Sequence, residues 1–340
     1  MVVIANAAVG KPWAHHATGI LCGLLAGAMF LFGAIDYATG GGSATDHNPA
    51  PVDFAIMATA LVAAAVASKP VREWIARFIP IDPDSPVHSL ALALAVILFG
   101  TQVASIAFTD VLAAEQQAAP LGVVDLLAQE VPFLVMAVAG VGIFMRRNTT
   151  QTGDRLGFVT PAWWHVALAV AAAGVFFAVS NGADSLSHAL TPSVAHRVDQ
   201  TTQHLFGGLA DPAGVIALAL IPGICEEALF RGALQPRFGV IVTALLFTSI
   251  HAEYGLSLDV PTIFLISVGL GLVRKYTNTT TSAACHVAYN LLVGFGLTGV
   301  ALYGGIAVEV VLAAVVVYAV WSIRRRAAVE KVAVQETPVG

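Results

Sequence analysis

Several stretches of this chain are apolar on every helical face over the length needed to cross a hydrocarbon core. A helix of a soluble protein keeps a polar face, whereas a membrane span needs about 20 predominantly apolar residues. Only 11% of the 340 residues are charged and 57% are hydrophobic, while soluble domains carry about 25% charged residues. The sequence therefore predicts a polytopic membrane protein whose helices are solvated by lipid.

The apolar runs lack the alternation of barrel strands, so they predict an all-α fold. Their boundaries at charged residues, Pro and Gly predict about ten transmembrane helices. The expected spans are 17–35, 53–68, 87–108, 121–145, 161–180, 213–230, 238–253, 260–273, 281–297 and 300–323.

The basic residues predict the orientation of these helices. Once the spans are set, all of the 16 Lys and Arg residues except Arg197 fall on one side of the membrane. Because Lys and Arg concentrate on the cytoplasmic side, both termini are expected in the cytoplasm. Residues 181–212, which include Arg197, are expected to form a long loop on the opposite side.

Charge and cysteine content exclude some classes of function. The net charge is −5 and no basic run is longer than Arg324 to Arg326, which argues against a nucleic-acid partner. Cys22, Cys225 and Cys285 all lie in apolar stretches, so packing roles are expected rather than disulfides.

Two adjacent carboxylates, Glu226 and Glu227, interrupt the sixth span. Each charge in the middle of a membrane helix costs about 2.5–3.5 kcal/mol, so the pair needs compensation. Adjacent helical residues point about 100° apart, while Glu227 and Arg231 share a face at i and i+4. We infer that Arg231 pairs with Glu227 and that Glu226 faces a cavity. From this segment alone, a structural ion pair at a helix end is an equal alternative.

Two neighbouring spans carry further polar residues at helical spacing. Phe247 and His251 are four residues apart, as are His286 and Asn290, so each pair shares one helical face. A single buried histidine is usually a hydrogen-bonded core residue. Three neighbouring spans that each present one polar stripe favour a shared site instead.

Three motifs thus follow one another in order on the sixth, seventh and ninth spans: Glu226-Glu227-x-x-x-Arg231, Phe247-x-x-x-His251 and His286-x-x-x-Asn290. The ordered set resembles the CPBP family of intramembrane proteases, also called Abi. That family includes the type II CAAX prenyl endopeptidases and bacterial relatives associated with bacteriocin processing or immunity. The Arg231-Gly232 and Gly269-Leu270-Gly271 steps also fit its pattern, and the resemblance covers 222–300.

The resemblance divides the chain into three parts. Residues 1–150 are expected to form N-terminal transmembrane helices of unknown role, and 151–323 a CPBP-like catalytic core. Residues 324–340 are expected to form a cytoplasmic tail.

Amide hydrolysis needs an activated nucleophile, a donor for the oxyanion and an acid for the leaving amine. The chain has neither a Gly-x-Ser-x-Gly elbow nor a His-Glu-x-x-His helix, which argues against serine and standard zincin schemes. Glu226, helped by His251, is then the best general base for a water molecule.

The family resemblance implies roles for the remaining motif residues. His286 and Asn290 would hold the oxyanion. Glu227, Arg231 and Phe247 would orient the site or contact the substrate.

No cofactor is required on this interpretation, but zinc is an open alternative. Glu226, His251 and His286 could supply three ligands and leave one position open. Three further histidines, eight residues apart in 181–212, could gather a metal but are expected to be solvated loop residues: His188, His196 and His204.

The motif residues lie at different depths in their predicted spans. His286 lies only a few residues inside its span, whereas Glu226 and His251 lie deeper. Either the ninth span begins earlier than 281 or the seventh begins with a tilted segment. The cavity is expected within the cytoplasmic half of the bundle and open to the cytoplasm.

Other polar residues inside the spans leave the extent of the site open. Asp125, Gln129 and Glu130 lie near the outer part of the fourth span, and Glu309 lies deep in the tenth. An acid within a membrane helix is a functional hypothesis by default.

The function predicted is hydrolysis of a peptide bond in a membrane-associated substrate, a CAAX-like tail or a leader peptide, by a multi-pass protein of the cell membrane. A peptide or protein substrate and the lipid bilayer are its expected partners. A non-catalytic scaffold or bacteriocin-immunity-like protein is one alternative. An ion-coupled transporter is another, although it predicts inverted repeats, and the polar residues here crowd into the last third of the chain.

Overall fold

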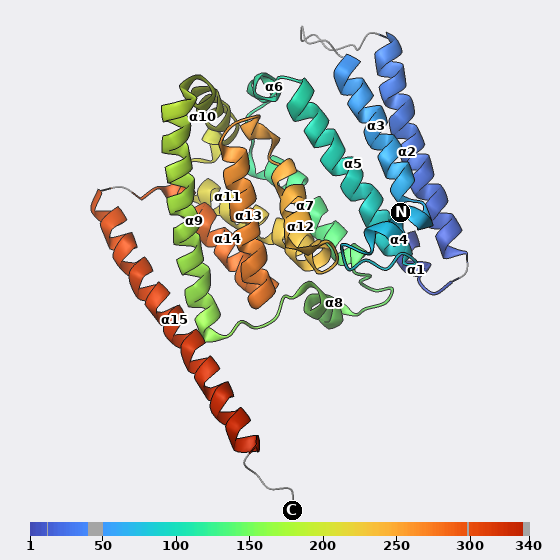
Figure 1. Cartoon of the computed structure of the whole chain (residues 1–340). Coiled ribbons are helices and arrows are strands. Elements are labelled where there is room, and N and C mark those ends of the chain that lie inside the picture. The colour runs from blue at the N-terminus through green and yellow to red at the C-terminus, as the bar shows by residue number, and fades with distance from the viewer. Residues whose placement is uncertain (12, 40–49, 298, 336–340) are drawn as a thin grey trace, which may run out of the picture.

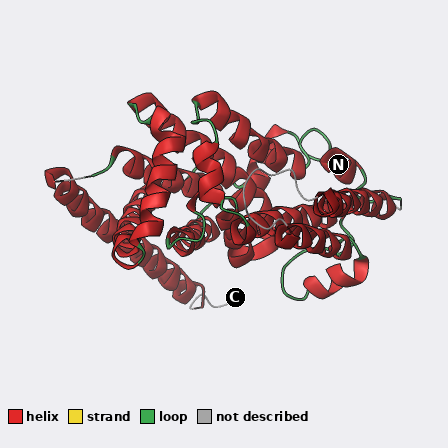
Figure 2. Cartoon of the chain, turned by 90° about the horizontal axis from the view of Figure 1, so that it is seen from above, coloured by secondary structure: helices red, strands yellow, loops and turns green. Residues whose placement is uncertain are grey.

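The computed structural model describes residues 1–11, 13–39, 50–297 and 299–335. In this part of the chain every regular element is a helix, as Figure 2 shows from above, and the one β-bridge is isolated. Backbone polar groups in lipid must be satisfied within the segment, and helices do this. The prediction of an all-α polytopic membrane protein is confirmed.

Each predicted span coincides with a helix of the structure. The helices are α2 (Ala14–Thr39), α3 (Ala50–Val66), α5 (Pro86–Phe108), α7 (Val123–Gly140), α9 (Trp163–Leu190), α11 (Pro212–Glu227), α12 (Gln235–Ser249), α13 (Asp259–Tyr276), α14 (Thr279–Phe295) and α15 (Gly299–Gln335).

The number of helices able to cross a membrane is smaller than ten. Among the described residues, six helices are long and apolar enough, or up to seven if the bent pair Pro51–Val66 and Lys69–Ile75 is one span. One of the six, Pro212–Ser249, has 38 residues but includes a π-helix at Ala228–Leu234 and a break at Gly239, so it is not one straight helix. It contains the sixth and seventh predicted spans. The helices α13 and α14 are shorter or more polar and do not qualify.

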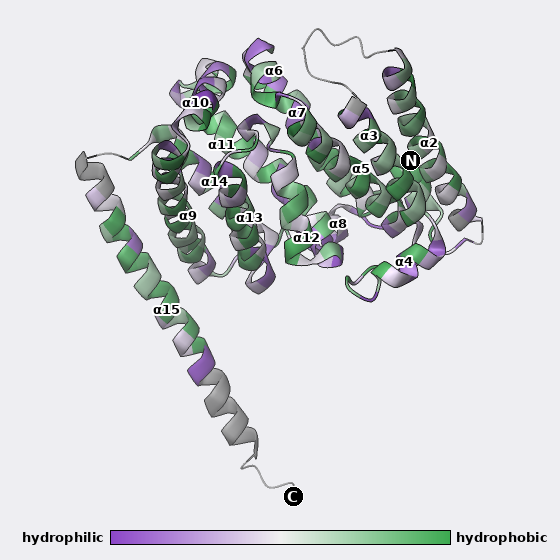
Figure 3. Cartoon of the chain, turned by 45° about the horizontal axis from the view of Figure 1, so that its top comes forward, coloured by the Kyte–Doolittle hydropathy of each residue, from purple (hydrophilic) through white to green (hydrophobic). Residues whose placement is uncertain are grey.

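Short helices gather at the two ends of the bundle, as Figures 1 and 3 show. At the first end, called here the α6/α10 end, lie α6 (Val111–Gln117), α10 (Pro192–Phe206), η1 (Gly207–Leu209) and η3 (Ala252–Tyr254). At the second end, called here the α4/α8 end, lie α1 (Val2–Ala7), α4 (Lys69–Ile75) and α8 (Thr149–Leu156).

The two ends differ in charge as the sequence predicts. Arg197, the one basic residue expected on the opposite side, lies in α10 and pairs with Asp110 at the start of α6, with Nη2 2.5 Å from Oδ1. The expected loop at 181–212 is wrong, because α9 continues to Leu190 and α10 begins directly after Thr191.

An irregular stretch joins α11 to α12 and determines where along the bundle the site residues lie. The chain continues from α11 into a π-helix, η2 (Ala228–Leu234), and breaks again at Gly239, where φ is 77° and ψ is 174°. The carbonyl of Gly232 accepts a hydrogen bond from Arg155 of α8 at 3.1 Å. A Cβ at position 232 would lie 2.8 Å from the carbonyl oxygen of Leu156, so only glycine fits this approach.

The seventh predicted span contains a break at Gly239 near its start, while its tilted or interfacial position stays a prediction. From there α12 leads to η3, which packs against α6 and α10. The helix of the ninth predicted span, α14, also begins slightly earlier than predicted, at Thr279.

The N-terminal helices share a hydrophobic core with the motif-bearing helices. Phe133 of α7 packs edge-on against Phe230 of η2, with ring centroids 6.0 Å apart. Leu92 of α5 and Leu246 of α12 belong to the same buried cluster. The first four long helices therefore support the site from one side.

The last helix, α15, packs along α9 at the edge of the bundle and extends beyond it (Figure 1). Of the predicted tail, residues 324–335 continue α15, and 336–340 lie outside the described residues.

Candidate active site

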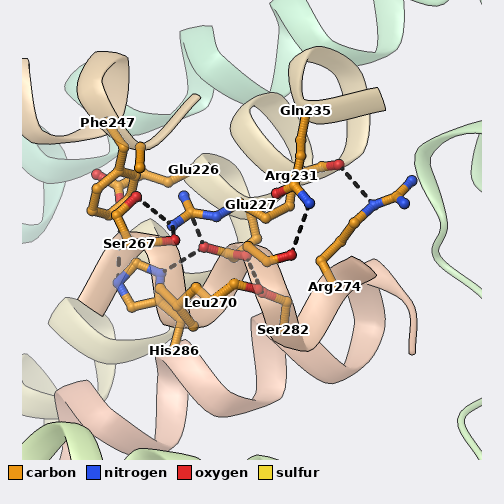
Figure 4. A network of polar contacts seen from close by, with 12 residues as sticks. Glu226, Glu227, Arg231, Gln235, Phe247, Ser267, Leu270, Arg274, Ser282 and His286 are labelled. Atoms are coloured by element: carbon orange, nitrogen blue, oxygen red, sulfur yellow. Dashed lines mark hydrogen bonds and ion pairs between the residues drawn. The ribbon is translucent and has the colours of Figure 1, made fainter. Parts of the chain in front are cut away.

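Glu227 lies at the end of α11 and is surrounded by an ion-pair partner and two hydrogen-bond partners (Figure 4). Its Oε1 is 3.2 Å from Nη1 of Arg231 and 3.2 Å from Nδ1 of His286, and Ser282 donates its hydroxyl to Oε2 at 2.5 Å. Glu227 and Arg231 are both 0% exposed. A buried charge is tolerated only with such partners, so the pairing expected from the i, i+4 spacing is present.

Arg231 is held from three further directions. Its Nη2 donates to the hydroxyl of Ser267 at 2.9 Å, and its guanidinium lies 4.3 Å from the ring centroid of Phe247. Its carbonyl accepts a hydrogen bond from Nε of Arg274 at 3.1 Å. A planar guanidinium held by an acid, a hydroxyl and an aromatic ring has one orientation available.

His286 links the two adjacent glutamates. A carboxylate only accepts hydrogen bonds, so Nδ1 of His286 carries the hydrogen that faces Glu227. The other ring nitrogen, Nε2, lies 3.8 Å from Oε2 of Glu226. Glu227 therefore fixes the orientation of the imidazole that faces Glu226.

Glu226 differs from its neighbour in having no tight partner. It is 4% exposed, and its Oε2 has no hydrogen-bond partner. It lines a cavity, whereas Glu227 does not. The divergence of the two side chains expected from helical geometry is present.

Phe247 packs among the other motif residues. Its ring lies 4.8 Å from that of His251 and 5.8 Å from that of His286, between centroids, and 5.3 Å from that of Phe230. Nδ1 of His251 lies 2.9 Å from the carbonyl oxygen of Phe247. Because a carbonyl only accepts, Nδ1 carries a hydrogen, and the neutral imidazole offers Nε2 as an acceptor.

Asn290 lies one turn beyond His286 on α14 and lines the same cavity. Its Nδ2 donates a long hydrogen bond of 3.4 Å to the carbonyl of Leu218. The amide is thus weakly held and free to turn towards a ligand.

The cavity has a volume of about 1070 Å³ and brings together residues from all three motifs. Its lining includes Glu226, Phe247, His251, His286 and Asn290. The structure thus brings to one cavity the residues that the sequence predicts to share a site.

The position of the cavity corrects one expectation. Its lining on α5, α7 and α13 comes from the part of each helix nearer the α6/α10 end, and residues of α6, α10 and η1 also contribute. Almost all Lys and Arg residues lie towards the other end. The prediction of a cavity within the Lys- and Arg-rich half is therefore wrong. The reason is that α12 returns past Gly239 and carries His251 to the α6/α10 end.

The motif residues lie within a segment that matches the model of a known protein family. The family model described as Rce1-like, type II CAAX prenyl endopeptidase Rce1-like, matches residues 209–292. Residues 209–292 are called here the endopeptidase-like domain, after the family model that they match. It contains every motif residue from Glu226 to Asn290, so the resemblance seen in the sequence is confirmed. Comparisons with curated proteins and with solved structures returned no match.

The glycines of the third helix of the endopeptidase-like domain allow close packing. A Cβ at Gly269 would lie 2.5 Å from the ring of Phe176, and one at Gly271 would lie 2.9 Å from Cγ1 of Val240. The carbonyl of Gly271 accepts a hydrogen bond from Gln235 at 2.8 Å. The Gly269-Leu270-Gly271 step thus sets the distance of α13 from α9 and α12.

Few groups of possible metal ligands converge in the part of the chain that the structure describes. Among the described residues, only Asp184, His188 and Asp199 bring three possible ligand atoms within 4.8 Å of one another, and all three are exposed. The zinc set Glu226, His251 and His286 does not converge in this way.

The three histidines of 181–212 have separate partners. His188 lies 3.0 Å from Asp199, His196 lies 3.2 Å from Gln200, and His204 lies 2.8 Å from the carbonyl of Ala118. They do not gather round one point.

Sequence reasoning missed several residues that support the endopeptidase-like domain. Ser267 and Ser282 hold Arg231 and Glu227, but a serine in an apolar helix gives no signal of its own. Glu253 and Tyr254 of η3 line the cavity. Burial raises the pKa of both Glu253 and Tyr254.

The polar residues whose roles the sequence left open lie in different parts of the structure. Asp125 accepts a hydrogen bond from the backbone N–H of Gly122 at 2.9 Å at the start of α7, which is a capping role. Gln129 and Glu130 line the cavity. The carboxylate of Glu309 lies against Gly174 of α9, away from the cavity.

Proposed function

We propose that this chain is an intramembrane endopeptidase that hydrolyses a peptide bond through a water molecule activated by Glu226. The observation that carries the proposal is the contrast between the two adjacent glutamates. Glu227 is fully paired, while Glu226 presents an unpartnered oxygen to the cavity, 3.8 Å from Nε2 of His286. A family of proteases matches the same residues.

The proposed chemistry uses groups already in the cavity. Glu226 takes a proton from water, and the hydroxide attacks the carbonyl carbon of the substrate. The same proton then passes from Glu226 to the leaving amine as the C–N bond breaks. His251, with Nε2 available as an acceptor, orients the water.

The oxyanion is stabilised by Asn290 and His286 on this proposal. The amide of Asn290 donates directly. His286 donates from Nε2 when both ring nitrogens are protonated, and Glu227 accepts the hydrogen on Nδ1. Glu227, Arg231 and Phe247 act as positioning residues.

The substrate is proposed to arrive from the non-cytoplasmic side of a cell membrane. Two observations support this: the cavity lies towards the α6/α10 end, and Lys and Arg concentrate at the other end. A peptide tethered at the outer face, such as a leader peptide, fits this side better than a cytoplasmic CAAX tail.

The proposal is tested with detergent-purified protein and a peptide library. Glu226→Gln is expected to lower kcat/KM by about 100- to 10,000-fold, the usual contribution of a general base. Glu309→Gln is the matched control, because it removes a membrane acid outside the cavity. Undiminished cleavage by Glu226→Gln would refute the assigned base, and loss of wild-type cleavage with a chelator would support the zinc alternative.

A further inference from the structure

The cavity contains more carboxylates than the proposed reaction uses. Its lining includes Glu115 of α6, Glu130 of α7 and Glu253 of η3 as well as Glu226. These acids form a continuous series: Glu226 interacts electrostatically with Glu130, Glu130 with Glu253, and Glu253 with Glu115. Among the residues that the structure describes, no Lys or Arg lines the cavity.

Glu130 is the member of this series that most requires a partner. It is 8% exposed, and its Oε2 is buried without a hydrogen-bond partner. A buried carboxylate in an apolar wall is expensive unless a donor or a cation meets it. The surrounding wall is apolar, including Leu126, Phe133 and Ile250.

The spacing of the acids distinguishes two kinds of cation. No three of these carboxylates and the cavity histidines bring ligand atoms within 4.8 Å of one another, among the described residues. A single metal ion needs several ligand atoms at about 2.0–2.6 Å. A larger organic cation with several N–H groups suits more widely spaced oxygens.

We propose that Glu130 and Glu253 form a subsite for a basic side chain of the peptide substrate, so that the enzyme prefers Arg or Lys close to the cleaved bond. This inference rests on the proposed function, because it names the substrate class of the same cavity. The apolar walls hold the rest of the peptide, and the carboxylates hold the guanidinium or ammonium group.

The burial of Glu253 is consistent with such a ligand. Burial raises the pKa of Glu253, and His251 only partly offsets this. A bound cation would supply a counter-charge to this buried carboxylate.

The test compares two fluorescent apolar peptides that differ only in one central residue, arginine or its neutral isostere citrulline. The protein is the full chain in detergent carrying Glu226→Gln, which stops cleavage on the proposed mechanism and retains Glu130 and Glu253. The arginine peptide is expected to bind about tenfold more tightly or better, as for a hydrogen-bonded charge.

Adding Glu130→Gln should bring the two affinities close together, and Glu253→Gln should reduce the difference. Adding Glu309→Gln should leave it unchanged. Thermal unfolding of each variant shows whether it has folded, and Glu253→Gln provides a second test if Glu130→Gln does not.

Three results would overturn the subsite. One is equal binding of the two peptides. Another is a preference that survives both Glu130→Gln and Glu253→Gln. The third is stoichiometric binding of Zn²⁺ alone that displaces the arginine peptide, since a metal would then occupy these acids.

Cleavage by the wild-type protein separates this inference from the proposed function. Equal cleavage of both peptides would contradict the subsite and support the protease function. A binding preference without cleavage of either peptide would support the subsite and contradict the protease function.

Discussion

Nη1 of Arg231 lies 3.2 Å from Oε1 of Glu227, one helical turn away, and neither side chain is accessible to solvent. The pair does not face the cavity. Through Glu227 the pair contacts Nδ1 of His286 and orients that imidazole towards Glu226. The charge pair is therefore part of the support of the site and not of its reacting surface.

Arg231→Met should destabilise the protein by about 3–5 kcal/mol, because it leaves Glu227 buried without its main counter-charge. Thermal unfolding in detergent measures this. The double variant Glu227→Gln with Arg231→Met should recover much of the loss, since no unpaired charge remains. A double variant as unstable as the single one would contradict the charge-burial explanation.

Ser282→Ala should cost about 1–3 kcal/mol, because the hydroxyl donates to the buried Oε2 of Glu227 at 2.5 Å. Ser322→Ala is the matched control. Its hydroxyl bonds only to the carbonyl of Ala319 within α15, so its effect should stay within about 0.5 kcal/mol. Equal effects of the two substitutions on the unfolding temperature would count against the role of Ser282.

Gly223→Ala should push α11 away from α14 and reduce activity. A Cβ at this position would lie 2.6 Å from Cγ2 of Val287 and 3.2 Å from its backbone nitrogen. Overpacking of this kind costs about 1–3 kcal/mol, and it would widen the gap between Glu226 and His286.

The control for this substitution is Gly27→Ala on α2, where a Cβ meets nothing within 4 Å. It should unfold at the wild-type temperature or slightly above it, because alanine favours a helix. The comparison uses both kcat/KM and thermal unfolding. Wild-type kcat/KM for Gly223→Ala would show that the α11 and α14 contact does not set the site.

Cysteine labelling should place the two ends of the bundle on opposite sides of the membrane. On a background without Cys22, Cys225 and Cys285, Arg197→Cys should react with an impermeant maleimide in intact cells. Arg77→Cys, exposed near the α4/α8 end, should react only after permeabilisation. The reverse pattern would place the cavity on the cytoplasmic side.

The free energy of unfolding should fall as the pH rises, because Glu253 releases its proton at a higher pH in the folded protein than in the unfolded chain. Burial raises the pKa of Glu253 above its ordinary value of 4.5. Between that value and the raised one, the folded protein keeps a proton that the unfolded chain has released, so the free energy of unfolding decreases as the pH rises. Glu253→Gln removes this dependence.

The measurement is the unfolding temperature of both proteins in detergent from pH 4.5 upwards. The variant should gain stability relative to the wild type as the pH rises. Parallel curves would show that Glu253 does not titrate differently in the folded protein.

Much of the fold could be predicted because membrane helices obey a local rule. A run of about 20 apolar residues must be helical in lipid wherever it lies in the chain, and the ten predicted segments are helices. The helical structure of 181–212 could not be predicted, since polar residues leave helix and loop equally open.

The candidate site followed from spacing within single helices. The i, i+4 relation joins Glu227 to Arg231 and places Glu226 on another face, whatever the rest of the fold does. The order of the three motifs indicated that they belong together.

Contacts between helices depended on the tertiary structure. Ser267 and Ser282 acquire their roles only because α13 and α14 pack against Arg231 and Glu227. Glu130, far from the motifs in sequence, reaches the same cavity because α7 packs against α11.

The sequence by itself determined the helical membrane architecture, the charge pair and the set of motif residues, since each depends on periodicity along one segment. Only the tertiary structure decided which end of the bundle holds the cavity. That outcome depends on the π-helix and the break at Gly239, which turn α12 back and carry His251 and Glu253 to the α6/α10 end. Hydropathy along the chain contains no information about such a reversal, because both arms of the turn are apolar.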